Sequence, residues 1–180
     1  MGGSYDIWWQ QIEAFEDRYR IVSVTYPPVN SLAGLSRGIT EILKKENIYS
    51  VYVLGTSLGG YLAQYLVAEH PEIVKKAVFA NTFPPNDIIL EKNGRLGSLL
   101  PYLPEWLIMK SFRGSILNSV VPAANNSELV KAFLLEQSYG LMSKAQFIGR
   151  YRCVVDPFTP GDPESHGNEY TRIIEGFFSE

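Results

Sequence analysis

The chain has 180 residues, of which 46% are hydrophobic and 19% charged, and its formal net charge is −3. This length and composition favour one globular domain and exclude a disordered chain. The mildly acidic balance gives no electrostatic reason to expect nucleic acid or an anionic membrane as a partner, and the apolar stretch 99–109 is broken by prolines and cannot span a bilayer.

Cysteine and histidine are too few and too far apart for a metal site, with one cysteine and two histidines in the whole chain. No metal is therefore expected, and no motif calls for a cofactor. Cys153 has no second cysteine to pair with, which fits a reducing compartment. Because no signal peptide is recognisable at the amino terminus, a cytoplasmic location is expected.

The first 81 residues alternate between helical and strand patterns. Apolar spacing marks the helices, while short runs of β-branched and aromatic residues mark the strands. This alternation predicts a parallel sheet with helices on its faces. In chain order the expected elements are a helix over 6–15, a strand over Tyr19–Tyr26, a helix over Leu32–Glu46, a strand from Val51 to Leu54, a helix up to Glu69 and a strand over Val74–Asn81.

From Thr82 the pattern changes, because prolines and glycines separate short helical pieces and no strand is recognisable. We expect a helical cap insertion over residues 83–158 on a core of residues 1–82. The apolar side chains of the cap either line a pocket or form a small core of its own. The expected pieces are helices near 97–103, 105–113, 127–139 and 143–150, a loop or short strand over Tyr151–Pro160, and a closing loop and helix over 159–180 that complete a single domain.

The most informative motif is Gly55-Thr56-Ser57-Leu58-Gly59, which fits the nucleophile-elbow pattern G-x-S-x-G between a strand and a helix. Such a turn is so tight that it strains the serine backbone and pushes the hydroxyl outwards, and the glycines leave room for the neighbouring strand and helix. The Leu58 amide at the helix start would then donate to a developing oxyanion. The alternative is a Gly-Ser turn without chemistry.

The elbow GTSLGG, together with GGSYDIWWQQIEAFEDRYRIVSVTYP before it and HPEIVKKAVFANTF after it, resembles the α/β-hydrolase superfamily. Within it, Ser-Leu-Gly-Gly followed by Leu62-Ala63-Gln64, and Asn81-Thr82-Phe83, are most similar to the maspardin-like branch. The resemblance covers roughly residues 3–160. It implies a partial α/β-hydrolase fold, with a mostly parallel sheet, flanking helices and a helical cap insertion.

The resemblance also implies a function. The first interpretation is a serine hydrolase that acts on a carboxylic ester or similar small acyl substrate, whether active or, in this shortened form, inactive. Maspardin-like proteins are regarded as protein-binding adaptors, so the alternative is a non-catalytic adaptor with a protein partner.

The chain departs from the family at both ends. Family members place two or three strands before the glycine-rich loop that supplies the second oxyanion amide, which here falls at Gly3. They also place two strands, carrying the acid and the histidine, where this chain has only the eight residues Thr159–His166. The sequence therefore resembles a shortened member, whether a fragment, an incorrect gene model or a deletion. Exposed sheet edges would then favour aggregation or a homodimer.

The partners of Ser57 are the least determined part of the expected site. A serine hydroxyl needs a base, and the base works best when a carboxylate orients it. His166 is the candidate base, with Asp156 or Asp162 as the acid, although His166 also fits a solvated residue at a helix entry. His70 is expected to be a cation at a helix carboxyl end, and Cys153 a structural residue.

Overall fold

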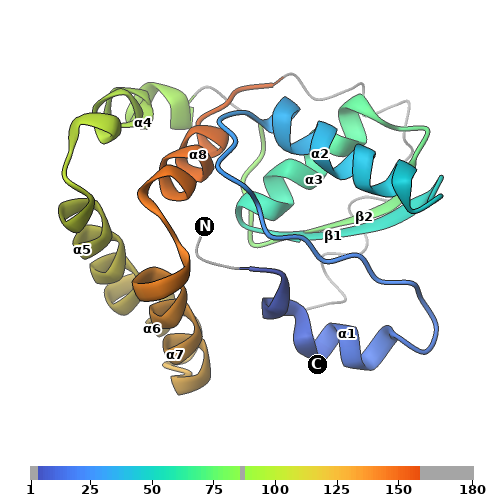
Figure 1. The fold of residues 1–180 in the computed structure, drawn as a ribbon, viewed down its shortest axis with the longest axis horizontal. Coiled ribbons are helices and arrows are strands. Elements are labelled where there is room, and N and C mark those ends of the chain that lie inside the picture. The colour runs from blue at the N-terminus through green and yellow to red at the C-terminus, as the bar shows by residue number, and fades with distance from the viewer. Residues whose placement is uncertain (1–3, 86–87, 159–180) are drawn as a thin grey trace. The chain divides into compact units, whose positions relative to one another are not determined.

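The structure is a computed structural model that describes residues 4–85 and 88–158 (Figure 1). These residues fall into two compact units. One combines the described residues of 1–28 with 99–148, and the other those of 29–98 with those from 149 onwards. We call the second the elbow unit, because it contains Ser57, and describe each unit by itself. The expected closing helix lies outside the described residues.

The elbow unit is built on two parallel strands, β1 (Val51–Thr56) and β2 (Val74–Ala80). Helix α3 (Leu58–Glu69) connects them and packs on both, while α2 (Leu32–Lys45) packs against α3 (Figure 1). Val53 pairs with Ala77 and Gly55 with Phe79 in the register of the two strands. Helices that cover a parallel sheet confirm the expected α/β class.

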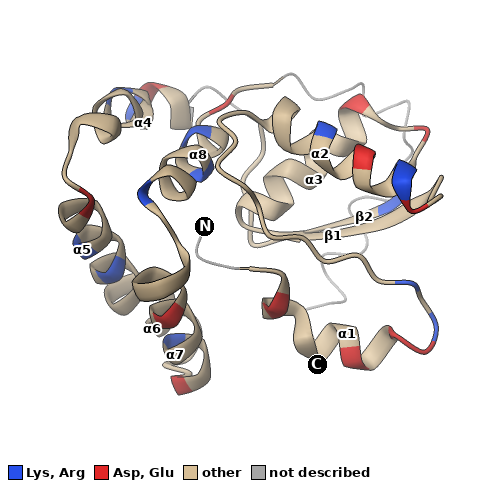
Figure 2. Ribbon diagram, in the orientation of Figure 1, with Lys and Arg blue, Asp and Glu red and all other residues tan. Residues whose placement is uncertain are grey.

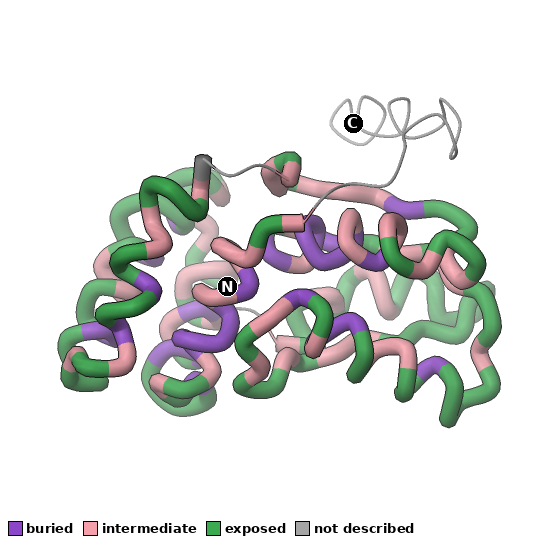
Figure 3. Tube along the Cα trace, turned by 90° about the horizontal axis from the view of Figure 1, so that it is seen from above, coloured by how far each residue is buried: buried purple, intermediate pink, exposed green. Residues whose placement is uncertain are grey.

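Most buried residues of the elbow unit belong to its helices (Figure 3). Helix α3 is buried over most of its surface because it lies between the sheet and α2, and its only charged residue is Glu69 at the carboxyl end (Figure 2). Leu58, Tyr61 and Leu62 are each at most 2% exposed. The residues after Ser57 are therefore held in a packed apolar environment.

Two further helices contribute to the elbow unit. They are most of α4 (Ile88–Leu99) and the end of α8 (Lys144–Val154). The Tyr151 hydroxyl donates to the Asn93 carbonyl at 3.2 Å, and thus joins α8 to α4. The prediction of a loop or short strand from Tyr151 is wrong for Tyr151–Val154, because these residues continue helix α8.

The other unit is helical in its described residues. It contains a 3-10 turn (Tyr5–Trp8) and α1 (Trp9–Phe15), then a 3-10 turn (Leu100–Tyr102), α5 (Glu105–Ser115), a π-helical turn (Ile116–Val120), α6 (Val121–Ala123), α7 (Glu128–Glu136), a second π-helical turn (Gln137–Leu141) and the start of α8. The absence of strands among the described residues of the expected cap was predicted. Its limits at 83 and 158 remain predictions.

Some of the apolar side chains of the cap helices form a small core, which was one of the two expected roles, whereas others are exposed. Phe112 and Phe133 pack against a small core formed by Ile116, Val121 and Leu134. By contrast, Tyr102 is 85% and Trp106 64% exposed. The insertion thus has a core of its own, and its exposed aromatic side chains lie elsewhere on the helices.

The prediction of a strand over Tyr19–Tyr26 is wrong. The residues from Arg20 to Tyr26 form no regular element, although their β-branched alternation is typical of a strand. A strand is defined by hydrogen bonds to a neighbour, and among the described residues β1 and β2 pair only with each other. The pattern alone does not supply that neighbour.

Self-association through the sheet stays a prediction. Tyr52 is 63% and Leu54 39% exposed on one face of β1. No helix among the described residues has both the length and the apolar character to cross a bilayer.

Candidate functional site

Ser57 occupies the turn between β1 and α3 with φ 53° and ψ −122°. Residues other than glycine rarely adopt a positive φ. This conformation costs on the order of 1–3 kcal/mol and is found mainly at functional sites. The Ser57 amide donates to the Ala80 carbonyl at 3.1 Å, so the turn is fixed to the end of β2. The side chain is exposed, and its hydroxyl makes no hydrogen bond with another described residue. This is the geometry expected of a nucleophile elbow.

Two glycines allow the close contact between β1 and α3 that this turn requires. A Cβ placed on Gly55 would overlap the Gly59 carbonyl group and lie 2.7 Å from the Gly60 nitrogen. A Cβ on Gly60 would lie 2.8 Å from the Thr82 Cβ. Glycine is therefore required where the helix crosses the end of the strand.

The amide of Leu58 lies in the first turn of α3, where backbone N–H groups have no acceptor within the helix. The helix dipole adds partial positive charge at the same end. An oxyanion that develops next to Ser57 would be stabilised by both effects. The second expected donor, Gly3, lies outside the described residues.

Asp156 lies beside α2 and α3. Its Oδ2 accepts a hydrogen bond from the Leu32 amide at 2.7 Å, and its carbonyl accepts one from the Tyr61 hydroxyl at 2.9 Å. Burial raises the pKa of Tyr65, and the negative charges of Glu69 and Asp156 raise it further. The Asp156 carboxylate accepts a hydrogen bond from the Leu32 amide, which has no acceptor within α2. At the same end of the helix, the Ser31 hydroxyl accepts a hydrogen bond from the Gly34 amide at 3.1 Å.

This contact predicts a stabilising role for Asp156. Asp156→Ala should lower the free energy of unfolding by about 1–2 kcal/mol, as loss of a helix-capping side chain does. Asp156→Asn should lower it by less than half of that, because its amide oxygen still accepts from Leu32. Urea unfolding measures both, with the exposed Asp17→Ala as control. Equal stability of Asp156→Ala and the wild-type protein would contradict the capping role.

His70 cannot be the base, because it follows the last residue of α3. The 12 residues of that helix separate it from Ser57 by about 18 Å at 1.5 Å per residue. Its Nε2 lies 3.0 Å from the Ser36 Oγ, and its Nδ1 lies 3.7 Å from a Glu72 oxygen. His70 thus lies at the carboxyl end of α3, where the sequence predicts it.

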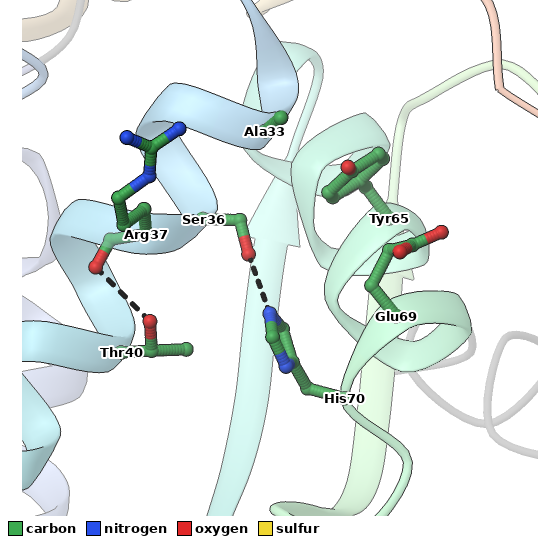
Figure 4. A pocket seen from close by; sticks show the side chains of 7 residues that line it. All are labelled: Ala33, Ser36, Arg37, Thr40, Tyr65, Glu69 and His70. Carbon is green, nitrogen blue, oxygen red and sulfur yellow. Dashed lines mark hydrogen bonds between the residues drawn. The ribbon is translucent and has the colours of Figure 1, made fainter.

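A shallow pocket of about 280 Å³ lies beside His70, between α2 and α3. Figure 4 shows that His70 and Ser36 point towards each other between the two helices. The pocket is not the site of the elbow, because its lining comes from residues 33–40 of α2 and residues 65–70 at the carboxyl end of α3.

Cys153 is buried, and its thiol lies 3.6 Å from the Val29 carbonyl oxygen. Burial, with a further contribution from Asp156, raises the pKa of the Cys153 thiol to about 12. A thiol with this pKa is protonated at neutral pH and a poor nucleophile.

The structure describes three of the expected site residues. Ser57, Leu58 and Asp156 belong to the elbow unit, whereas His166 and the alternative acid Asp162 lie outside the described residues. The expected site did not include Thr82, whose hydroxyl donates to the Ser57 carbonyl at 2.8 Å. Its signals in the sequence were its place directly after the strand that follows the elbow and its presence in the Asn81-Thr82-Phe83 stretch that carries part of the resemblance.

Residues 28–108 match a protein-family profile described as alpha/beta hydrolase fold. A RutD protein of Serratia proteamaculans, named as a carbamate hydrolase, is 28% identical over 97 residues, which cover 48% of this chain and 36% of the relative. A RutD protein of Agrobacterium fabrum is 25% identical, with 48% and 37% covered. The matched part is thus little more than a third of these relatives' length.

Solved structures agree with the profile. A hydrolase from Pseudomonas aeruginosa PA01 superposes with a TM-score of 0.64 at 20% identity, with 87% of this chain and 61% of that chain covered. The enol-lactonase of Burkholderia xenovorans LB400 superposes with a TM-score of 0.67 at 12% identity, with 87% and 62% covered. At these identities the likeness shows the fold alone.

Proposed function

We propose that this chain, which has the α/β-hydrolase fold, is a serine hydrolase in which Ser57 attacks the acyl carbon of a carboxylic ester or similar substrate. The observation that carries the proposal is the backbone of Ser57, which is held at φ 53° with an exposed hydroxyl. A turn without chemistry would be less strained with glycine at this position. A serine kept there despite the strain supports a role for its hydroxyl.

In the proposed reaction, Ser57 Oγ forms a bond to the acyl carbon while its proton passes to His166. The carbonyl oxygen becomes an oxyanion that accepts hydrogen bonds from the amides of Leu58 and Gly3. Collapse of this intermediate breaks the bond to the leaving group, which takes the proton from His166. Water, activated by the same histidine, then hydrolyses the acyl-enzyme and regenerates Ser57.

We assign Asp156 as the acid that orients His166. Its Oδ2 is taken by the Leu32 amide, while its Oδ1 accepts no hydrogen bond from another described residue. One carboxylate has enough lone pairs for both partners. Asp162 is the alternative acid within the chain order serine, acid, histidine.

The proposed substrate class is a small acyl compound. The curated relatives are named for carbamate hydrolysis, in which the attacked carbonyl carries a nitrogen and an oxygen substituent. Ester and carbamate cleavage place the same demands on the nucleophile and the oxyanion donors, so both belong to one class of test substrates.

We further propose a cytoplasmic location and self-association. The first rests on Cys153, the only cysteine, which is a buried free thiol. The second rests on the exposed apolar side chains Tyr52 and Leu54 of β1.

A fluorophosphonate probe, which phosphonylates activated serines, tests the proposed function. The wild-type protein should be labelled, and heat-unfolded protein should not. His166→Ala should reduce the labelling rate by about 10²–10⁴-fold, the usual effect of a general base. His70→Gln is the matched control and should react like wild type. No label on the folded wild-type protein would overturn the proposal, whereas unchanged labelling of His166→Ala would remove only the assignment of the base.

A further inference from the structure

We propose that Thr82 is a positioning residue that aims the Leu58 amide at the oxyanion by holding the carbonyl of Ser57. The inference rests on the proposed hydrolase function, and it adds a residue from the loop after β2 to the site. The hydroxyl of Thr82 donates to the Ser57 carbonyl oxygen at 2.8 Å. The same oxygen accepts the Tyr61 amide at 3.0 Å, as in any helix.

The peptide group links this carbonyl to catalysis. The Ser57 carbonyl and the Leu58 N–H belong to one planar trans peptide, in which the two bonds point in opposite directions. Any tilt of the carbonyl therefore tilts the amide by the same angle. Since hydrogen bonds weaken steeply when the donor is misaligned, the Thr82 hydroxyl sets how well Leu58 stabilises an oxyanion.

Thr82 is itself held in place by its neighbours. The preceding residue, Asn81, has φ 48°, which turns the chain sharply at the end of β2. Asparagine tolerates this conformation better than other side chains that bear a Cβ. The side chain of Thr82 then packs against Gly60, where no other residue would fit.

The residue after Thr82 is fixed to α3 as well. The Gln64 side chain donates to the Phe83 carbonyl at 3.0 Å and to the Gly60 carbonyl at 3.3 Å. The Phe83 ring lies 4.5 Å from that of Tyr61, centroid to centroid. These contacts make the loop a rigid support, so that the Thr82 hydroxyl presents a fixed donor to the strained turn.

Thr82→Val tests the hydroxyl while keeping the shape that packs on Gly60. Phosphonylation by the fluorophosphonate should slow by about tenfold to a hundredfold. Loss of a whole oxyanion donor costs about 10²–10³-fold, and in this variant the Leu58 amide is still present but misaligned. Thr82→Ser should retain at least about a third of the wild-type rate. Thr40→Val is the matched control, since its hydroxyl also donates to a backbone carbonyl, that of Arg37 at 3.0 Å. It should react like wild type.

The rate constant per folded molecule separates positioning from stability. A merely structural role would lower the amount of folded protein and the labelling amplitude, with the rate constant unchanged. Amide hydrogen exchange gives a second reading that does not depend on activity. In Thr82→Val the Tyr61 amide should exchange about threefold to tenfold faster, while the amides of later turns in α3 keep their wild-type rates.

Equal phosphonylation rates of Thr82→Val and wild type would overturn the inference and leave the proposed function intact. If the wild-type protein takes no label, the proposed function fails. Tyr61 exchange then decides whether Thr82 holds the Ser57 carbonyl, because an unchanged rate in Thr82→Val would overturn that as well.

Discussion

Replacing Ser57 by alanine is expected to abolish reaction with a fluorophosphonate, with a fall of more than about 10³-fold in rate, because loss of a triad nucleophile costs about 10⁶-fold in turnover in a well-built site. The oxygen that forms the covalent bond is then missing, and nothing else among the described residues replaces it. Cys153 is buried, with a thiol pKa of about 12. Gel fluorescence and intact mass both measure the loss.

The same substitution should leave the fold unchanged. The Ser57 side chain is exposed, and its hydroxyl makes no hydrogen bond with another described residue. Ser57→Gly should even raise the free energy of unfolding by about 1 kcal/mol, since it removes the strain at φ 53°. Ser50→Ala, at an exposed position just before β1, is the control for labelling. Persistent labelling of Ser57→Ala would place the nucleophile elsewhere.

Gly55→Ala should have the largest effect on stability. The added methyl group would overlap the Gly59 carbonyl and lie 2.7 Å from the Gly60 nitrogen, and both are backbone groups that no rotamer change can move. Overpacking by one methyl group costs about 1–3 kcal/mol when the neighbours are side chains. Because only separation of β1 from α3 relieves the overlap, we expect a loss of about 3 kcal/mol or more, measured by urea unfolding.

Gly38→Ala is the matched control for this substitution. Gly38 lies within α2, and a Cβ placed there meets nothing within 4 Å. Alanine should therefore stabilise the protein by about 0.5–1 kcal/mol through its higher helix propensity. If Gly55→Ala were as stable as wild type, this result would contradict the close contact between β1 and α3 at Gly55.

The elbow could be predicted because its signals are local. A short apolar run, a Gly-x-Ser-x-Gly turn and a segment with apolar residues at helical spacing follow one another within about twenty residues, and each depends on its nearest neighbours along the chain. The structure places β1, Ser57 and α3 at those positions. Helix α2 and strand β2 were predicted equally well. Each begins at the expected residue and ends one residue earlier than expected.

The parts that were missed depend on distant residues. Tyr19–Tyr26 has the composition of a strand, but a strand needs a partner that composition does not supply. Asp156 meets Leu32 across 124 positions of the chain, and Thr82 meets Ser57 across 25. No periodicity encodes such pairs, so the capping role of Asp156 and the support from Thr82 came only from the structure.

The most direct test of the account is the location of the fluorophosphonate adduct in the folded wild-type protein. Tryptic peptides analysed by tandem mass spectrometry identify the modified residue. We expect a single adduct on Ser57, and no adduct in heat-unfolded protein. An adduct on another residue, or no adduct on Ser57 in folded protein, would contradict the proposal that this elbow carries a reactive serine.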